Sequence, residues 1–379
     1  MTRWKMQVQV DGIIYQNQSY GGVSRIFTEI LPRMCEFDPT LQITIFTTGS
    51  CQQDIPAHPG IRHQSLLPID DLLRPRRIWR PVQQSARRLV QQLSLDNRNE
   101  AIWHSTYFTE PRNWNGPAVV TVYDMIYERF PEFFSSANDA RFRKQKQSSV
   151  LAADSVICIS ETTLKDVQSY YGVNSAKLQA IPLAYNRVFR RLETSNCSQQ
   201  PSNTKPFLLY VGKRDRYKNF KTLLQAFCAW QRRKEVNLLV VGPDWSDQER
   251  KWLVDWGCVD HVHLLHGVDD QLLACLYNHA QAFVYPSLYE GFGIPLLEAM
   301  ASGCPIVASY IPSTVEVAGE QPFYFEPKDV NSLLAALDAA LSEGHQPSRV
   351  ESGIKRAQHY SWDKTAQKTL HVYRSLIDT

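Results

Sequence analysis

Two glutamates and two glycines stand close together in the stretch YEGFGIPLLEAMASG, which begins at Tyr289. Glu290 and Glu298 are eight positions apart, with Gly291 and Gly293 between them. A carboxylate can accept hydrogen bonds from two sugar hydroxyls, and glycine lets a backbone N–H approach a ligand closely. A helix that begins here adds partial positive charge, which favours phosphate. The stretch suits a nucleotide sugar, although such residues also serve only as helix caps and turns.

A run of cations is the second group of residues that could do chemistry. The stretch YVGKRDRYKN contains Lys213, Arg214, Arg216 and Lys218 directly after a short apolar run. A diphosphate that departs with negative charge needs cations aimed at it. Arginine can bind phosphate through two nitrogens, and lysine acts as a point charge. A solvated basic turn is the alternative interpretation of this run.

The N-terminal half holds a third group of candidates. QSYGGVSR places Gly21 and Gly22 where a helix should begin and Arg25 one turn later, which again suits an anion. A plain tight turn is the alternative. His104, in WHSTYF, ends another apolar run and could also reach a ligand, although a lone histidine is more often structural.

The elements that must position these residues alternate along the chain. Short apolar runs such as QVQVDGIIY, AVVTVYDMI, PFLLYVG and AFVYPS alternate with helical patterns such as VSRIFTEILPRM and NFKTLLQAFCAWQ. This alternation predicts parallel sheets with helices on both faces. The polar, aperiodic stretch RLETSNCSQQPSNTK separates two such halves. Ligands of such sheets bind beyond the carboxyl ends of the strands, so we expect the site in a cleft between the halves.

Composition limits the class of protein. The 379 residues suggest two domains, and a net charge of +3 does not indicate a nucleic-acid partner. The 8 cysteines form no C-x-x-C pair, so we expect buried single thiols in a reducing compartment. The amino terminus lacks the apolar core of a signal peptide, and no apolar run approaches the ~20 residues that span a bilayer. We therefore expect a cytoplasmic protein.

Residues 72–93 form a basic stretch that differs from the rest. LLRPRRIWRPVQQSARRLVQQL contains six arginines and a tryptophan but no acidic residue. Basic residues mixed with Trp and Leu suit peripheral contact with an anionic membrane surface. An exposed positive helix, or a site for an acidic acceptor, is the alternative.

The stretch YPSLYEGFGIPLLEAMASGCPIVAS resembles the E-x7-E signature of retaining glycosyltransferases of family 4 (group 1), which have the GT-B fold. VICISETTLKDVQSYYGV, LLYVGKRDRYKNFKTLLQAF and SWDKTAQKTLHVYRSL also resemble the family, in order, and the mannosyltransferase-like branch is the most similar. The resemblance implies two Rossmann-like α/β domains of doubly wound parallel sheets. These are an acceptor-binding domain (1–195) and a donor-binding domain (205–358), and a C-terminal helix (359–379) packs on the first.

The resemblance also implies roles for residues of the second half. Glu298 should hold the ribose, Glu290 should contact the donor sugar, and the backbone near residues 266–268 should read the base. Lys218 and a second cation, for which we choose Arg214, should meet the diphosphate. The expected donor-binding residues are Gly212, Lys213, Gly267, Val268, Glu290, Gly291, Phe292, Gly293, Ile294 and Glu298.

In the first half, many relatives carry His-Asp where this chain has Tyr123 and Asp124. Tyrosine can donate a hydrogen bond to a sugar hydroxyl but cannot carry positive charge at pH 7. The expected catalytic residues are Glu290, Lys218, Arg214 and Asp124. The residues expected near the acceptor and the diphosphate are Gly21, Gly22, Arg25, His104 and Tyr123.

The resulting hypothesis is a retaining hexosyltransferase that uses a nucleotide sugar, with GDP-mannose as the expected donor and a glycan or lipid-linked acceptor. The chain has no Asp-x-Asp stretch and no His/Cys cluster at ligand spacing, so we expect no bound metal. The family implies front-face attack, with the leaving phosphate as the base. The alternatives are a nucleotide-sugar epimerase of the same fold and a non-catalytic donor-binding subunit, which Tyr123 motivates.

Overall fold

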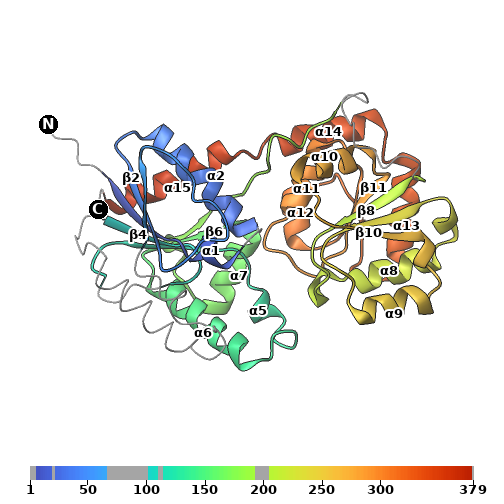
Figure 1. Ribbon diagram of the computed structural model, residues 1–379, viewed down its shortest axis with the longest axis horizontal. Helices are drawn as coiled ribbons and strands as arrows, with labels where there is room; N and C mark the ends of the chain where they lie inside the picture. The colour runs from blue at the N-terminus through green and yellow to red at the C-terminus, as the bar shows by residue number, and fades with distance from the viewer. Residues whose placement is uncertain (1–5, 19–21, 66–100, 110–113, 193–204, 378–379) are drawn as a thin grey trace. The chain divides into compact units, whose positions relative to one another are not determined.

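The structure is a computed structural model that describes residues 6–18, 22–65, 101–109, 114–192 and 205–377 (Figure 1). The chain forms two compact units. The first consists of residues 1–183 and 362–379, and the second of residues 184–361. Each unit is built on one parallel sheet, as the alternation of strands and helices predicts.

The sheet of the first unit has seven parallel strands in the order β3-β2-β1-β4-β5-β6-β7. Its strands are β1 (Gln7–Asp11), β2 (Gln42–Thr47), β3 (Ile61–Ser65), β4 (Ala101–Ser105), β5 (Ala118–Val122), β6 (Ser155–Cys158) and β7 (Leu178–Ala180). Its helices are α1 (Ile13–Asn17), α2 (Gly22–Phe37), α5 (Ile126–Arg129), α6 (Ala137–Ala152), α7 (Glu161–Tyr171), the 3₁₀ helix η1 (Ser175–Lys177) and α15 (Trp362–Ile377). The order reverses between β1 and β4, which lie side by side in register from Gln7 and Ala101.

Helix α2 confirms the amphipathic pattern of its sequence. Ile26, Phe27, Ile30, Leu31 and Met34 are buried, as their helical spacing predicts. Helix α6 begins with a capping box, in which the Ser136 hydroxyl and the Asp139 carboxylate each bond to the other residue's backbone N–H. These local signals explain why the helices begin and pack where they do.

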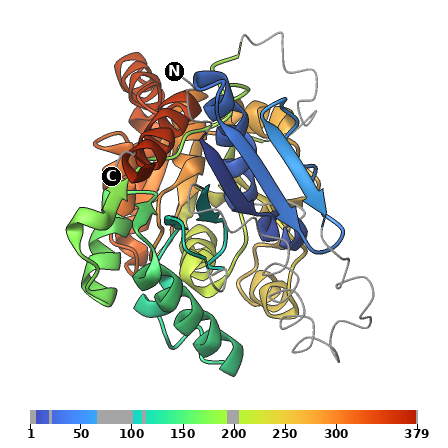
Figure 2. The ribbon, with the colours of Figure 1, turned by 90° about the vertical axis from the view of Figure 1, so that its left-hand side faces the viewer.

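The last helix, α15, packs beside α2 in the first unit (Figure 2). Arg33 on α2 donates to Asp363 at 3.0 Å, and the Thr365 hydroxyl donates to the carbonyl of Pro182 at 2.7 Å. The Tyr373 hydroxyl lies 2.5 Å from Nδ1 of His104. The prediction that the C-terminal helix packs on the N-terminal domain is therefore confirmed.

His104 is a structural residue and not the ligand-facing residue that the sequence suggested. Its side chain is fully buried, and Nε2 lies 2.8 Å from the Thr121 hydroxyl. Burial lowers the pKa of His104 to about 3. The prediction that His104 lies at the end of a strand is confirmed, but Tyr373 of α15 contacts its imidazole ring.

We expect His104 to make the protein less stable in mild acid. In the unfolded chain its imidazole takes up a proton near pH 6.5, whereas in the folded state it stays neutral down to about pH 3. Stability should therefore fall as pH drops from about 6 to 4, by at most about 1.4 kcal/mol per pH unit. Urea unfolding across this range should show a shallower pH slope for His104→Gln, which cannot titrate. Equal slopes in the two proteins would contradict the assignment.

The sheet of the second unit has six parallel strands in the order β10-β9-β8-β11-β12-β13. Its strands are β8 (Phe207–Val211), β9 (Asn237–Val241), β10 (Val262–Leu265), β11 (Ala282–Tyr285), β12 (Ile306–Ser309) and β13 (Phe323–Phe325). Its α-helices are α8 (Phe220–Ala229), α9 (Asp247–Asp255), α10 (Asp270–His279), α11 (Ile294–Ala301), α12 (Pro312–Ala318), α13 (Val330–Glu343) and α14 (Pro347–Ala357). Its 3₁₀ helices are η3 (Arg216–Lys218), η4 (Gln231–Lys234) and η5 (Val259–His261).

Residues 184–192 pack with the second unit, although the sequence analysis assigned them to the first domain. The Asn278 amide donates to the carbonyl of Arg190 at 2.9 Å and accepts from the Leu192 N–H at 2.8 Å. Composition placed the domain boundary in the polar stretch that follows Arg190. It could not show these contacts, because they join positions far apart in the sequence.

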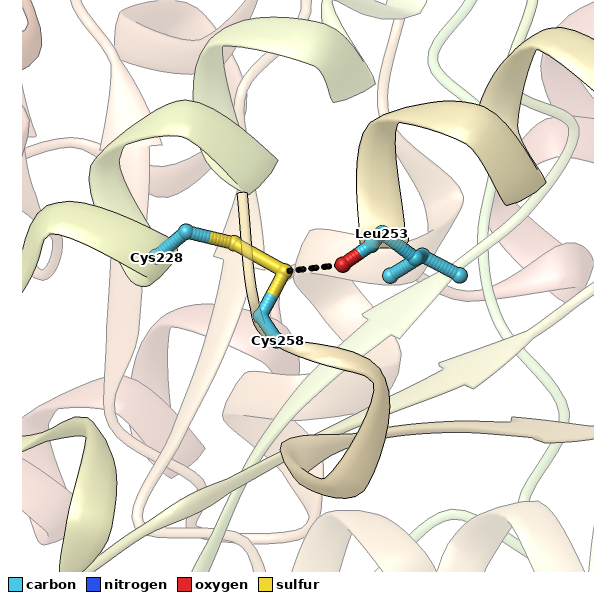
Figure 3. Close-up of a disulfide and its surroundings, with 3 residues drawn as sticks. All are labelled: Cys228, Leu253 and Cys258. Carbon is cyan, nitrogen blue, oxygen red and sulfur yellow. Dashed lines mark hydrogen bonds between the residues drawn. A yellow bond between two sulfur atoms is a disulfide. The ribbon is translucent and has the colours of Figure 1, made fainter. Parts of the chain in front are cut away.

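Cys228 and Cys258 form a disulfide in the core of the second unit (Figure 3). It joins the end of α8 to the segment after α9, and both cysteines are buried. The expectation of single thiols is wrong for this pair. The two cysteines are 30 residues apart in sequence, and the fold brings their Cα atoms to within 5.7 Å of each other. The described cysteines that form no disulfide are Cys35, Cys51, Cys158, Cys275 and Cys304. In the described part of the chain, no helix has the length and apolar character needed to cross a bilayer.

Candidate functional site

The candidate site of the second unit lies where its strand order reverses. β8 and β11 are neighbours, although β9 and β10 come between them in the sequence. The basic loop (residues 212–219) follows β8, and the glutamate loop (residues 286–293) follows β11. Ligands of doubly wound sheets bind beside such a reversal, at the carboxyl ends of the strands. The two motifs that the sequence singled out are thus brought together.

Two sets of hydrogen bonds hold these loops against each other. The backbone N–H of Leu288 donates to the carbonyl of Tyr217 at 2.7 Å. The Asn219 amide donates to the carbonyls of Pro286 at 3.0 Å and Pro327 at 2.6 Å. Asn219 has a φ of 56°, a left-handed conformation that asparagine tolerates better than most residues. Asn219 therefore fixes the residue before it, Lys218, relative to the glutamate loop.

Lys218 and Glu290 form an ion pair in this arrangement. The Lys218 ammonium lies 2.7 Å from Oε1 of Glu290, and the Ser287 hydroxyl donates to the same oxygen at 2.5 Å. The side chains of Lys218 and Glu290 are 22% and 12% exposed. Beneath them, burial raises the pKa of Tyr285 well above its usual value, and the charge of Glu290 adds to this effect. A cation and a carboxylate are thus held together, partly accessible, at the reversal.

The second glutamate of the motif lies on α11. Glu298 is 4% exposed, and the Tyr277 hydroxyl donates to its Oε2 at 3.4 Å. Gly293 precedes the helix with a φ of 134°, and a Cβ at this position would lie 2.8 Å from Cδ1 of Leu296. The positive φ favours glycine at this position, and α11 begins directly after it. Pro295 stands in the first turn, as predicted.

Arg214 is held by protein groups through two of its three guanidinium nitrogens. Its Nε donates to Oε1 of Glu249 at 2.6 Å, and Nη2 donates to the carbonyls of Pro243 and Asp244 at 2.8 and 2.7 Å. The guanidinium also lies 4.5 Å from the centre of the Trp245 ring, and the side chain is 3% exposed. These protein groups brace the basic loop, and Nη1 is the one guanidinium nitrogen without a partner among the described residues, so the assignment of Arg214 to the diphosphate stays a prediction.

The other predicted donor-binding residues lie at the same edge of the sheet. Gly212 and Lys213 follow β8, and the carbonyl of Lys213 accepts from the Tyr210 hydroxyl at 2.6 Å. Gly267 and Val268 follow β10, two strands away from β8. The glutamate loop supplies Gly291, Phe292 and Gly293, and Ile294 is the first residue of α11. In the described part of the chain, no group of three or more His, Cys, Asp and Glu side chains could hold a metal ion.

The candidate residues of the first unit have the following positions and partners. The Tyr123 hydroxyl donates its proton to the carbonyl of Thr106 at 2.7 Å, so in this structure it does not have a free proton to donate to a sugar hydroxyl. Asp124 is half-buried, and its Oδ1 accepts from the N–H of Ile126 at 3.1 Å. Gly22 begins α2, and Arg25 lies one turn later. Gly21 and residues 72–93 lie outside the described residues.

Sequence reasoning missed the residues that position this site. Ser287 orients Glu290, Asn219 joins the loops and Glu249 holds Arg214. Asparagine directly after Lys218 was a usable signal, because asparagine often takes left-handed conformations between elements. Ser287 and Glu249 gave no local signal.

Two family models match the chain in succession. The description "Glycosyltransferase Family 4" matches residues 20–187, and "Glycosyl transferases group 1" matches residues 193–357. The chain belongs to the family 4 glycosyltransferases. The glycosyltransferase is 26% identical, over 292 residues, to "O-antigen chain mannosyltransferase B" of Escherichia coli, which covers 75% of this chain and 76% of that protein.

Two further comparisons support the same family and fold. An O-antigen chain mannosyltransferase of Salmonella typhimurium is 31% identical over 241 residues, which are 63% of this chain and 64% of that protein. The structure of a sucrose-phosphate synthase from Thermosynechococcus elongatus superposes with a TM-score of 0.80 at 20% identity. That match covers 98% of this chain and 99% of that chain, and it confirms the GT-B fold.

Proposed function

We propose that this glycosyltransferase moves mannose from GDP-mannose to a hydroxyl of a glycan or lipid-linked acceptor, with retention and without a metal ion. The Lys218–Glu290 pair at the strand reversal carries the proposal. Two curated relatives are named mannosyltransferases, which supports mannose as the sugar. Neither name specifies the nucleotide, so GDP rests on the resemblance to the mannosyltransferase-like branch.

The chemistry assigned to these residues follows from their charges. The bond between the sugar C1 and the diphosphate oxygen breaks, and its electron pair leaves with GDP. The Lys218 ammonium stabilises the negative charge on that oxygen. The acceptor oxygen bonds to C1 on the same face, and its proton passes to the departing diphosphate oxygen. Glu290 holds hydroxyls of the donor sugar, and Glu298 those of the ribose.

A donor-binding subunit without activity is the second candidate. It is favoured by Tyr123, where many relatives have histidine and where the hydroxyl here bonds to the backbone. Slow hydrolysis of GDP-mannose by the pure protein, lost in Glu290→Gln, would exclude this candidate. Binding of the donor with no hydrolysis and no transfer to any acceptor would favour it.

We expect Glu298→Gln to weaken donor binding by roughly 10- to 100-fold, because an amide accepts fewer hydroxyl hydrogen bonds than a carboxylate and forms weaker ones. Calorimetry with GDP-mannose, UDP-glucose and UDP-N-acetylglucosamine measures this and identifies the nucleotide. The control is Glu343→Gln on α13, an exposed glutamate far from this loop in the sequence. Equal donor affinity in Glu298→Gln and the parent protein would contradict the ribose assignment, and tighter binding of a UDP-sugar would replace GDP-mannose.

A further inference from the structure

The first unit has its own strand reversal, between β1 and β4, and the loop after β4 is firmly held there. The buried Asp11 carboxylate accepts from the N–H of Thr106 at 3.0 Å and also bonds to the hydroxyls of Thr106 and Thr109. The Tyr123 hydroxyl holds the carbonyl of Thr106. A buried carboxylate devoted to one loop shows that the loop's shape is fixed.

That shape includes a strained residue. Phe108 has a φ of 56°, which is rare for a bulky side chain and costs about 1–3 kcal/mol. Its ring is buried 6.3 Å from the Tyr123 ring, and its carbonyl accepts from the Gln145 amide at 2.8 Å. The strained turn sets the position of its neighbour, Tyr107.

Tyr107 is one end of a continuous aromatic surface, which we define as Tyr107, Phe142, Tyr127 and Phe134. The ring centres of Tyr107 and Phe142 are 5.5 Å apart, and those of Phe142 and Tyr127 are 4.8 Å apart. Tyr127 and Phe134 stack at 4.1 Å. All four side chains are half-buried, so they present ring area to solvent at the end of the sheet where the reversal lies.

Polar groups border this surface. Burial and then the nearby charge of Asp124 raise the pKa of Tyr107 to about 12, so its hydroxyl remains protonated at neutral pH. Among the described residues, the Tyr107 hydroxyl has no hydrogen-bond partner. The surface thus combines flat apolar rings with a hydroxyl and a carboxylate at its edge.

Such a combination fits a sugar ring. One face of a pyranose carries C–H groups that pack on aromatic rings, and its hydroxyls need acceptors such as a carboxylate. A lipid chain would bury the charged Asp124 carboxylate with only the N–H of Ile126 to compensate it, at a cost in free energy, and an anionic group would be repelled by it. We propose that the aromatic surface and Asp124 bind a neutral sugar residue of the acceptor. This inference rests on the proposed function, because it names the acceptor chemistry for the same reaction.

The test uses the whole protein and defined sugars. Saturation-transfer NMR measures binding of methyl α-D-mannopyranoside, methyl α-D-glucopyranoside and α-mannobiose, and calorimetry measures GDP-mannose in parallel. We expect binding of at least one sugar, weakened ten-fold or more in Tyr127→Leu and Asp124→Asn. Asparagine can still accept from the N–H of Ile126, so Asp124→Asn should fold normally. The control is Phe133→Leu, because the Phe133 ring stacks on Phe130 in the same segment.

The two proposals fail in different ways. If no sugar binds, or if Tyr127→Leu and Asp124→Asn bind as the parent protein does, the acceptor inference is overturned while intact donor binding leaves the proposed function standing. Loss of sugar binding in Phe133→Leu as well would also overturn it, because the effect would not be specific to the surface. Sugar binding without binding of any nucleotide sugar would instead contradict the proposed function.

Discussion

Lys218→Ala should lower kcat/KM for donor turnover by roughly 100- to 1,000-fold, the usual loss when a preorganised charge or donor at a developing anion is removed. The Lys218 ammonium is held by Glu290 at the strand reversal and remains partly exposed, so a diphosphate can reach it. The fold should survive, because the Lys218 ammonium is partly exposed and Glu290 keeps the Ser287 hydroxyl as a hydrogen-bond partner. Steady-state kinetics and thermal unfolding measure the two effects separately.

A lysine three residues later provides the control. Lys221 is exposed on α8, and its ammonium lies 5.3 Å from the centre of the Trp252 ring. Lys221→Ala should leave kcat/KM within about two-fold of the parent value, as a surface substitution outside the site would. Near-normal kcat/KM in Lys218→Ala would remove this residue from the mechanism. Glu290→Gln should combine non-additively with Lys218→Ala, because the two side chains touch.

The site of the second unit could be predicted from sequence because its parts follow local rules. Glycines, a proline and two glutamates between a strand and a helix must lie at the carboxyl end of that strand, and the structure places them there. The pairing of Lys218 with Glu290 required one further fact, that β8 and β11 are neighbours. That adjacency depends on the order of strands in space, which hydrophobic periodicity does not encode.

Side-chain partners far apart in sequence could not be predicted in the same way. His104 ends a strand as expected, but a helix that begins at Trp362 covers it. Three rings of the aromatic surface lie between Tyr127 and Phe142, but the fourth, Tyr107, follows β4, so the sequence alone does not show that the four are in contact. In each case local composition was read correctly, and a contact between distant segments decided the outcome.

Arg214 shows the consequence of such a contact most clearly. Removing one partner of a buried ion pair leaves the other charge without compensation, which costs about 3–5 kcal/mol. Arg214 and Glu249 are 3% and 9% exposed, so Arg214→Met should destabilise the protein by about this amount. Urea unfolding followed by tryptophan fluorescence measures the loss, and Arg214→Met/Glu249→Gln should recover part of it because no charge remains buried.

The pH dependence separates this bracing role from diphosphate binding. Burial alone would raise the pKa of Glu249, but hydrogen bonds from Arg214 and Ser246 hold it below its usual value. The stabilisation is therefore present above about pH 4.3, the pKa of an unperturbed glutamate, and is lost as pH falls through the lowered pKa in the folded state. The difference in unfolding free energy between the parent and Arg214→Met should accordingly shrink in acid below about pH 4. If Arg214→Met lost activity but kept the stability of the parent protein at every pH, Arg214 would instead be assigned to diphosphate binding.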